Sequence, residues 1–374
     1  MAVTETTTVS WGSRLSGSIK GVLFGILLFM VGFPVLFKNE GRAVTATKTN
    51  EEGAATVVEA TAGEVDPAQE GKLIHVVGEA TTKDVLTDSE YGVSATVISM
   101  VREVEMYQWV EHTETKEEKK LGGKVEQVTT YTYTKEWCSS PVNSDGFKEQ
   151  DKINPPARRE LGDKRIYAKE VTLGVRRLND EQIHSIGREE RLVVKYQPVT
   201  TNEFFEVSGS VPVPRIGDIR ATFSVVRPHV VTIVAGQAGS TFMSYTAKST
   251  KKSISHVMDG AIDAEGVFAA AERNITIITW VLRIVGFFMM FFGLSMVMKP
   301  ISVLADVLPI LGDIVEIGTG LVAGIVAFVC SLVTIAVAWI FYRPVLAVLL
   351  LLLAAGAIFL LWKKRQAKKP AVVA

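Results

Sequence analysis

An uncharged stretch of 26 residues, Ile317–Tyr342, reads IGTGLVAGIVAFVCSLVTIAVAWIFY. A bilayer core about 30 Å thick needs roughly 20 apolar residues in a helix, so this stretch is long enough to cross a membrane. The whole chain of 374 residues is 48% hydrophobic and 21% charged, with a mean hydropathy of +0.25. This composition excludes general disorder and indicates a protein embedded in a membrane.

Three further apolar stretches flank a long polar middle region. Gly21–Phe37 has 17 uncharged residues, Ile275–Met298 has 24 residues interrupted once by Arg283, and Pro344–Trp362 has 19. Arg343 alone separates the last two stretches, so they predict a tight helical hairpin. The sequence therefore predicts four transmembrane helices.

The first apolar stretch resembles a secretory signal, because basic residues precede it. However, residues 33–38 read FPVLFK and contain no small-x-small cleavage pattern. We therefore favour an uncleaved signal anchor over a cleaved signal peptide.

The basic C-terminal tail, residues 363–374, sets the predicted orientation. It carries five lysines and arginines and no acidic residue, which places it in the cytoplasm by the positive-inside rule. Four spans then put residues 1–20 and the connector 299–316 in the cytoplasm as well, with residues 38–274 on the outer side. Apolar residues recur at helical spacing within the connector and predict a short interfacial helix, or a cap over the bundle.

Strand signals dominate the large middle region. Val104–Val110 and Tyr131–Trp137 are rich in β-branched and aromatic residues. Between them, Gly122-Gly123 supplies the positive φ angles that a hairpin turn needs. The predicted fold is an α+β membrane protein, with a β-rich extracytoplasmic domain inserted between the first and second of four transmembrane helices. Further strands are expected at 73–77, 191–197, 204–207, 221–226 and 230–235, and a short helix at 180–187.

No catalytic constellation is recognisable. The five histidines are scattered, and no HExxH, Cys-x-x-Cys, phosphate loop, GxGxxG or GxSxG motif occurs. Cys138 and Cys330 lie in dissimilar surroundings and predict free thiols. The formal net charge is zero, with an acidic middle and basic ends, which argues against a nucleic-acid binder. We therefore expect no enzyme activity, no cofactor and no metal.

One charge lies well inside a predicted span. Arg283 follows the start of its span by eight residues, nearer the outer face, and a charge there is costly unless it pairs or snorkels. We favour outward snorkelling over a buried pair. The candidate partners on the cytoplasmic side are Asp306, Asp313 and Glu316, and Arg343 is a further interfacial charge.

Small residues mark candidate helix-packing faces. Gly320 and Gly324 form a GxxxG pattern in the third span, and Gly21 and Gly25 repeat that spacing in the first. Small side chains let helices approach closely. Packing within the bundle and homo-oligomerisation both fit the pattern.

Several motifs resemble the LUMA family, the transmembrane protein 43 family. Directly after the first span, residues 37–44 read FKNEGRAV. The other motifs follow in order along the chain: VEMYQWVE (104–111), YTY (131–133), EW (136–137), GDIR (217–220) and AWIFYRP (338–344). The resemblance implies a four-span protein that organises membrane-protein complexes. Eukaryotic members lie in the endoplasmic reticulum and inner nuclear membrane, with the large domain in the lumen. The short, Thr-rich N-terminus fits a bacterial member in the cell inner membrane, with a periplasmic domain.

The leading functional hypothesis is a non-enzymatic organiser or scaffold that contacts the lipid bilayer and other membrane proteins. A lipid-handling or lipid-sensing protein is the main alternative, and a transporter or channel is a weaker one. The motif Asn39-Glu40-Gly41-Arg42 is a candidate docking site at the outer membrane surface. Asn and Gly predict a turn there, and Glu40 or Arg42 is expected to pair with Arg273 or Glu272. A simple interfacial anchor is the alternative.

Overall fold

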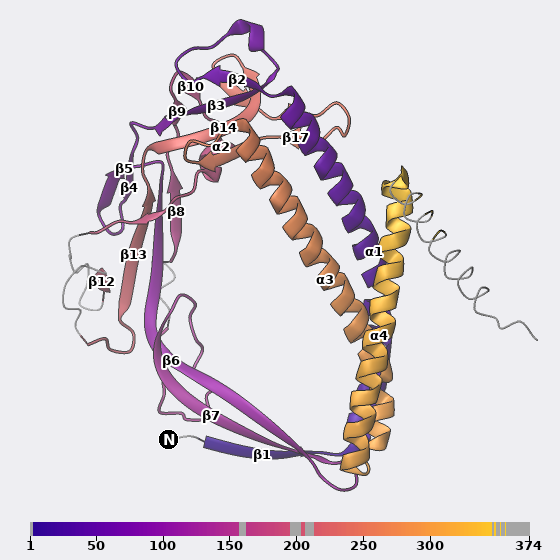
Figure 1. Cartoon of the computed structure of the whole chain (residues 1–374). Coiled ribbons are helices and arrows are strands. Elements are labelled where there is room, and N and C mark those ends of the chain that lie inside the picture. Colours follow the sequence, from indigo (N-terminus) through magenta and orange to yellow (C-terminus); the bar gives the residue numbers. More distant parts are fainter. Residues whose placement is uncertain are drawn as a thin grey trace, which may run out of the picture. The chain divides into compact units, whose positions relative to one another are not determined.

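The computed structural model describes residues 3–156, 162–194, 203–205 and 213–345, together with residues 348, 352 and 356. The chain divides into two compact units. The β-rich unit comprises Met1–Thr7, Thr49–Glu117 and Gln127–Ala271. The helical unit comprises Thr8–Lys48, Glu118–Glu126 and Glu272–Ala374. Figure 1 shows the elements of both.

Three long helices make up most of the helical unit: α1 (Trp11–Thr56), α3 (Ala264–Ala305) and α4 (Pro309–Tyr342). Each is long and apolar enough to cross a membrane, judged by length and composition. They contain the first three predicted spans, so an α+β protein with apolar helices and a large β-rich region is confirmed. Most of the fourth predicted span, 344–362, lies outside the described residues.

The predicted turn at Asn39–Arg42 is wrong. Helix α1 continues through these residues to Thr56. The residues that follow the motif include Ala43, Lys48 and Glu51, which favour helix, and one Gly in a long helix costs only about 1 kcal/mol. The motif therefore presents its side chains from one rigid helix.

The predicted separate helix in the connector is also wrong. Residues 300–305 form the end of α3, and α4 begins at Pro309, so only residues 306–308 lie between the two helices. Pro309 occupies the first turn of α4, where its missing N–H leaves no hydrogen bond unmade. The connector is thus a tight α3–α4 corner.

Helices α1 and α3 pack closely in antiparallel directions. Gly25 faces Gly293, and Leu36 packs over Gly286. The bundle core comprises Leu36, Met290 and Ala327, surrounded by phenylalanines from α1 and α3. Helix α4 buries a face of mostly small side chains that recur every three or four residues: Ala323, Ala327, Ser331, Thr334 and Ala338.

The predicted hairpin is confirmed. Strands β6 (Ser99–Lys119) and β7 (Val125–Cys138) are neighbours in one sheet, and Gly122 and Gly123 between them have φ of 81° and 74°. The order of this sheet is β1-β7-β6-β13-β11, with β8 on β6 and β12 on β13. The other strands are β1 (Val3–Val9), β8 (Lys164–Tyr167), β11 (Glu190–Arg191), β12 (Glu203–Phe205) and β13 (Ile219–Val226).

A second sheet has the order β18-β14-β15-β10-β9-β3-β2, with β14 also paired to β3. Its long antiparallel pair, β3 (Leu73–Thr81) and β14 (His229–Ala238), confirms two predicted strands. The other strands are β2 (Val58–Thr61), β9 (Thr172–Leu173), β10 (Arg176–Arg177), β15 (Thr241–Met243) and β18 (His256–Asp259). Two small hairpins pair β4 (Val85–Asp88) with β5 (Val93–Thr96) and β16 (Tyr245–Thr246) with β17 (Ser253–Ile254).

The short helix α2 (Asp180–Ser185) forms where it is predicted. Asn179 is its N-cap: the Asn179 side chain accepts from the Gln182 backbone N–H, and the Gln182 side chain accepts from the Asn179 backbone N–H. Of the strand predicted at 191–197, residues 195–197 lie outside the described part, and only β11 is described there. The predicted strand at 204–207 is described only to Phe205.

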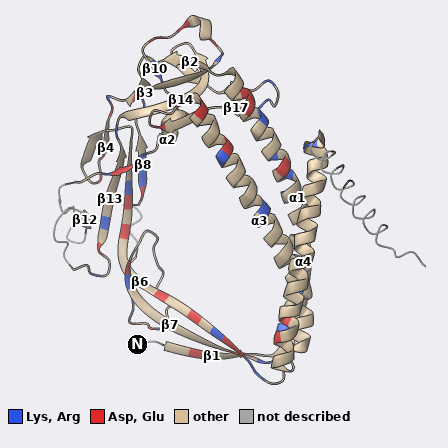
Figure 2. Cartoon of the chain, in the orientation of Figure 1, with Lys and Arg blue, Asp and Glu red and all other residues tan. Residues whose placement is uncertain are grey.

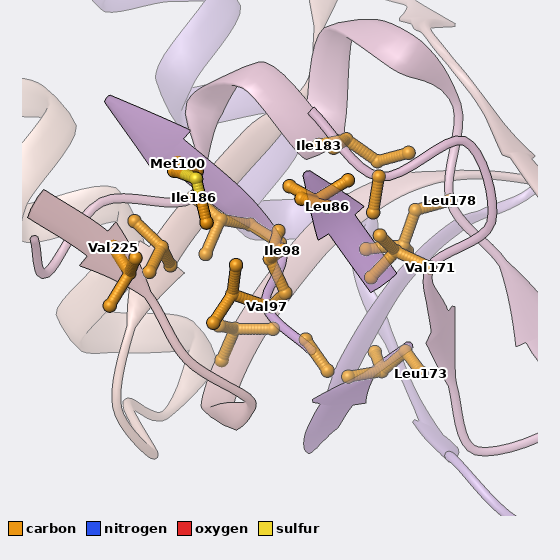
Figure 3. Close-up of a cluster of buried hydrophobic side chains, with 14 of the residues drawn as sticks. Leu86, Val97, Ile98, Met100, Val171, Leu173, Leu178, Ile183, Ile186 and Val225 are labelled. Carbon is orange, nitrogen blue, oxygen red and sulfur yellow. The ribbon is translucent and has the colours of Figure 1, made fainter. Parts of the chain in front are cut away.

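One hydrophobic core ties the β-rich unit together. It takes Ile74 and Val76 from β3 and Phe223 and Val225 from β13, so both sheets contribute to it. Figure 3 shows Ile183 of α2 and Ile186, which directly follows the helix, in this core beside Leu86 and Met100, so the core fixes the position of α2.

Candidate functional site

A buried carboxylate joins the three long helices. Glu40 of α1 is 1% exposed. Its Oε1 accepts a hydrogen bond of 2.7 Å from Arg283 Nε, and its Oε2 accepts bonds of 2.9 Å from Arg283 Nη2 and Trp339 Nε1. Arg283 belongs to α3 and Trp339 to α4, so one side chain links all three helices.

The neighbouring residues of the motif add further bonds between α1 and α3. Asn39 Nδ2 donates to the Thr279 carbonyl oxygen at 3.0 Å, and Arg42 Nη2 donates to Thr279 Oγ1 at 3.0 Å. The ring of Tyr342 lies against Gly41, where a Cβ atom would be 2.5 Å from Tyr342 Cζ. We call Asn39, Glu40, Arg42, Thr279, Arg283 and Trp339 the Glu40 cluster.

The pair in the Glu40 cluster corrects two interpretations of the sequence. Arg283 does not snorkel outward, because its side chain is only 18% exposed and is bound in a forked pair by Glu40. Glu40 binds neither Arg273 nor Glu272, and Glu272 instead accepts a bond from Thr47 Oγ1 at 3.1 Å. Removing charges from water is costly, and the forked geometry with a third donor offsets that cost.

A second polar cluster lies at the α3–α4 corner. Asp306, 1% exposed, forms ion pairs with Arg14 of α1 and with Lys119, whose Nζ is 3.1 Å from Asp306 Oδ1. Lys119 also donates to Asp313 Oδ1 and Glu316 Oε2, each at 2.8 Å. The three predicted partners of Arg283 therefore bind other cations. We call Arg14, Lys119, Asp306, Asp313 and Glu316 the corner cluster.

The charges of the corner cluster perturb one another. Partial burial works to lower the pKa of Lys119, but hydrogen bonds to Asp313, Glu316 and Asp306 outweigh it and raise that pKa. The Lys119 and Lys299 hydrogen bonds lower the pKa of Glu316 from 4.5 to about 2. Glu316 precedes the predicted third span, and Figure 2 shows charged residues at this end of α4.

Acid is expected to weaken the corner cluster. Because the pKa of Glu316 is lower in the folded protein, this group stabilises the fold fully above pH 4.5, and the contribution is lost as the pH falls toward 2. We expect Glu316→Gln to lose less thermal stability than the unmodified chain between about pH 5 and about pH 3. Thermal unfolding in detergent measures both. An equal loss in the two proteins would contradict the assignment.

The four glycines predicted to pack helices differ in their surroundings. Gly25 lies at the contact of α1 with α3. A Cβ atom placed on Gly324 would be 3.7 Å from Phe291 Cε2, an ordinary packing distance. A Cβ atom on Gly21 or Gly320 would meet only open space.

Arg343 lies at the end of α4, where its backbone N–H donates to the Trp339 carbonyl oxygen at 2.8 Å. Among the described residues, no group of three or more His, Cys, Asp or Glu could hold a metal ion.

The family model for transmembrane protein 43 matches residues 106–344. The mouse protein of that name is 33% identical to this chain over 375 aligned residues, which cover 95% of the chain and 93% of the mouse protein. The chain belongs to the transmembrane protein 43 family. The human member of that name is 32% identical with the same coverage, and the Drosophila homolog is 29% identical over 92% of the chain and 94% of its own length. No solved structure matches the chain.

In this member of the transmembrane protein 43 family, sequence reasoning missed four residues of the two clusters. One is Thr279, the α3 residue that binds Asn39 and Arg42. Trp339 lies in a family-like motif but receives no role from its pattern alone. Lys119 stands in a charge run that is typical of a solvated strand end, and Arg14 looks like an ordinary basic residue before a span. The Trp339 Nε1 donor inside an apolar span, together with the charge of Arg283, was the available signal for a buried acceptor.

Proposed function

We propose that this member of the transmembrane protein 43 family is a non-enzymatic multi-pass membrane protein that organises membrane-protein complexes. The observation that supports this best is the Glu40 cluster. Glu40 of α1 binds Arg283 of α3 and Trp339 of α4, and these bonds hold the three helices together. A helix bundle with a fixed arrangement can present a constant surface to partner proteins.

The same observation favours an organiser over the transporter alternative. Substrate paths in transporters commonly use broken helices and polar groups near the bilayer midplane. Here the buried charges within the described spans, Glu40 and Arg283, are satisfied by each other and by Trp339. They are therefore committed to holding helices together.

The test is the size of the native assembly. The protein is extracted gently from its own membrane, and its complexes are resolved under native conditions with mass spectrometry of co-migrating proteins and lipids. We expect the unmodified chain in complexes with defined protein partners, and Glu40→Gln in smaller ones. The exposed carboxylate variant Glu51→Gln is the matched control and should behave like the unmodified chain. A chain found only alone would refute the proposal, and a stoichiometric lipid with no protein partner would favour the lipid-handling alternative.

A further inference from the structure

Lys38 and Arg42 of α1 have no anionic partner among the described residues. Arg42 Nη2 donates to Thr279 Oγ1 at 3.0 Å and to Asn39 Oδ1 at 3.3 Å, and neither acceptor carries a charge. The Nε atom of Arg42 is buried and has no hydrogen-bond partner in the described part of the chain. Lys38 is exposed and lies one helical turn before Arg42, so the two side chains project from the same side of α1. This pair of cations therefore lacks an anion.

The Glu40 carboxylate does not supply that anion. Both of its oxygens accept hydrogen bonds from Arg283, so it is already paired. Residues 36–47 of α1 and 275–286 of α3 together contain three cations and the single carboxylate of Glu40. Pairing Arg283 with Glu40 leaves two positive charges in excess at this end of the helix pair.

Helix contacts set the depth of these two charges. Glu272, which lies just before the apolar run of α3, accepts a hydrogen bond from Thr47 of α1. At 1.5 Å per residue, Arg42 and Lys38 lie about 8 Å and about 14 Å further along α1 toward its apolar run than that contact. They are thus level with the first part of the apolar run of α3.

That part of α3 is exposed as well as apolar. Its exposed side chains are Ile277, Ile278, Trp280, Val281 and Ile284. Tryptophan is enriched where a membrane meets water, so Trp280 indicates the level at which lipid headgroups give way to acyl chains. Cations of one helix and exposed apolar side chains of its neighbour therefore occur at the same boundary.

A ligand that suits this boundary has an anionic head and an apolar body. Arginine binds phosphate oxygens strongly, and lysine extends its charge along an alkyl stem toward the headgroups. We propose that Lys38 and Arg42 bind the phosphate of one anionic phospholipid, whose acyl chains lie along the exposed apolar residues of α3. A free phosphate ion would satisfy the cations but would leave those apolar residues uncovered. The inference does not rest on the organiser function proposed above.

The test is lipid binding to the purified full chain in a neutral detergent, followed by native mass spectrometry. Dioleoylphosphatidylglycerol and dioleoylphosphatidylcholine are titrated separately, and glycerol 3-phosphate is then added as a soluble competitor. We expect the anionic lipid to bind several-fold more tightly than the zwitterionic one, with one lipid retained per chain. Glycerol 3-phosphate should not displace it at the same concentration, because it lacks acyl chains.

Substitutions locate the site. Lys38→Gln and Arg42→Gln are each expected to weaken binding of phosphatidylglycerol about fivefold, the usual effect of one basic residue at an anionic lipid surface. Lys38 is exposed, so its variant keeps the fold and carries the test even if Arg42→Gln is unstable. Lys48→Gln is the matched control, since Lys48 is an exposed lysine of the same helix beyond the contact of Thr47 with Glu272. It should leave the affinity unchanged.

Four results would overturn the proposal. Equal affinity for the two lipids would remove the role of charge, and unchanged affinity in Lys38→Gln would remove this site. An equal loss in Lys48→Gln would show a general attraction to the charge of α1. Displacement by glycerol 3-phosphate at the same concentration would show a site for free phosphate and not for a lipid.

Discussion

Replacing Glu40 by glutamine is expected to lower the free energy of unfolding by about 3–5 kcal/mol, which is the usual loss when one partner of a buried ion pair is removed. The variant leaves Arg283 buried with no counter-charge, and an amide cannot accept both guanidinium bonds as an anion does. Trp339 Nε1 would also lose a charged acceptor. Thermal unfolding in detergent should show a clear drop in Tm relative to the unmodified chain.

A second substitution distinguishes the net contribution of the ion pair to the free energy of unfolding from the cost of leaving one charge without its partner. Glu40→Gln combined with Arg283→Met removes both charges, so no ion is left without a partner. Replacing a buried ion pair by uncharged side chains is often nearly neutral. We therefore expect the double variant to be more stable than Glu40→Gln alone. The single variant Arg283→Met completes the comparison. If the double variant lost as much stability as Glu40→Gln and Arg283→Met lose together, Glu40 and Arg283 would not interact in the protein.

Glu51→Gln is the control for this series, since Glu51 is an exposed carboxylate of the same helix. Surface substitutions usually change stability by less than about 0.5 kcal/mol. If Glu51→Gln and Glu40→Gln lowered Tm equally, the loss would come from the charge of the helix as a whole and not from the Glu40 cluster.

The elements that the sequence predicts well are those with a strong local pattern. The apolar runs within α1, α3 and α4 are long enough to predict these helices without any tertiary information. Likewise, Gly122-Gly123 between two β-branched stretches predicts the β6–β7 turn from backbone geometry alone. Both predictions rest on residues close together in the chain.

The candidate sites depend on residues far apart in the chain, and local patterns mislead there. Asn39 and Gly41 are typical turn residues, so the sequence predicts a turn where α1 in fact continues. That helix places Glu40 beside Arg283, which lies 243 positions later in the chain. Lys119 lies 197 positions before Glu316, and its charge run alone predicts a solvated lysine and not a member of the corner cluster. Only the packing of the helical unit brings these side chains together.

The second large effect is expected from a single methyl group at the contact of α1 and α3. A Cβ atom on Gly293 would lie 2.6 Å from the Phe29 backbone nitrogen and 2.7 Å from the Gly25 carbonyl oxygen. Backbone atoms cannot move aside as a flexible side chain can, so Gly293→Ala must push the two helices apart. Overpacking of this kind costs about 1–3 kcal/mol, and close approach at small residues is a main source of helix association in membranes.

The matched control has the opposite expected sign. A Cβ atom on Gly320 of α4 meets nothing within 4 Å, so Gly320→Ala adds a methyl group in open space. Alanine is favoured over glycine in a helix by about 1 kcal/mol, and this variant should be neutral or more stable. Tm in detergent measures both variants. If Gly320→Ala destabilised the protein as much as Gly293→Ala, Gly320 would be in contact with a partner helix, and the GxxxG pattern of α4 would act between chains rather than within the bundle.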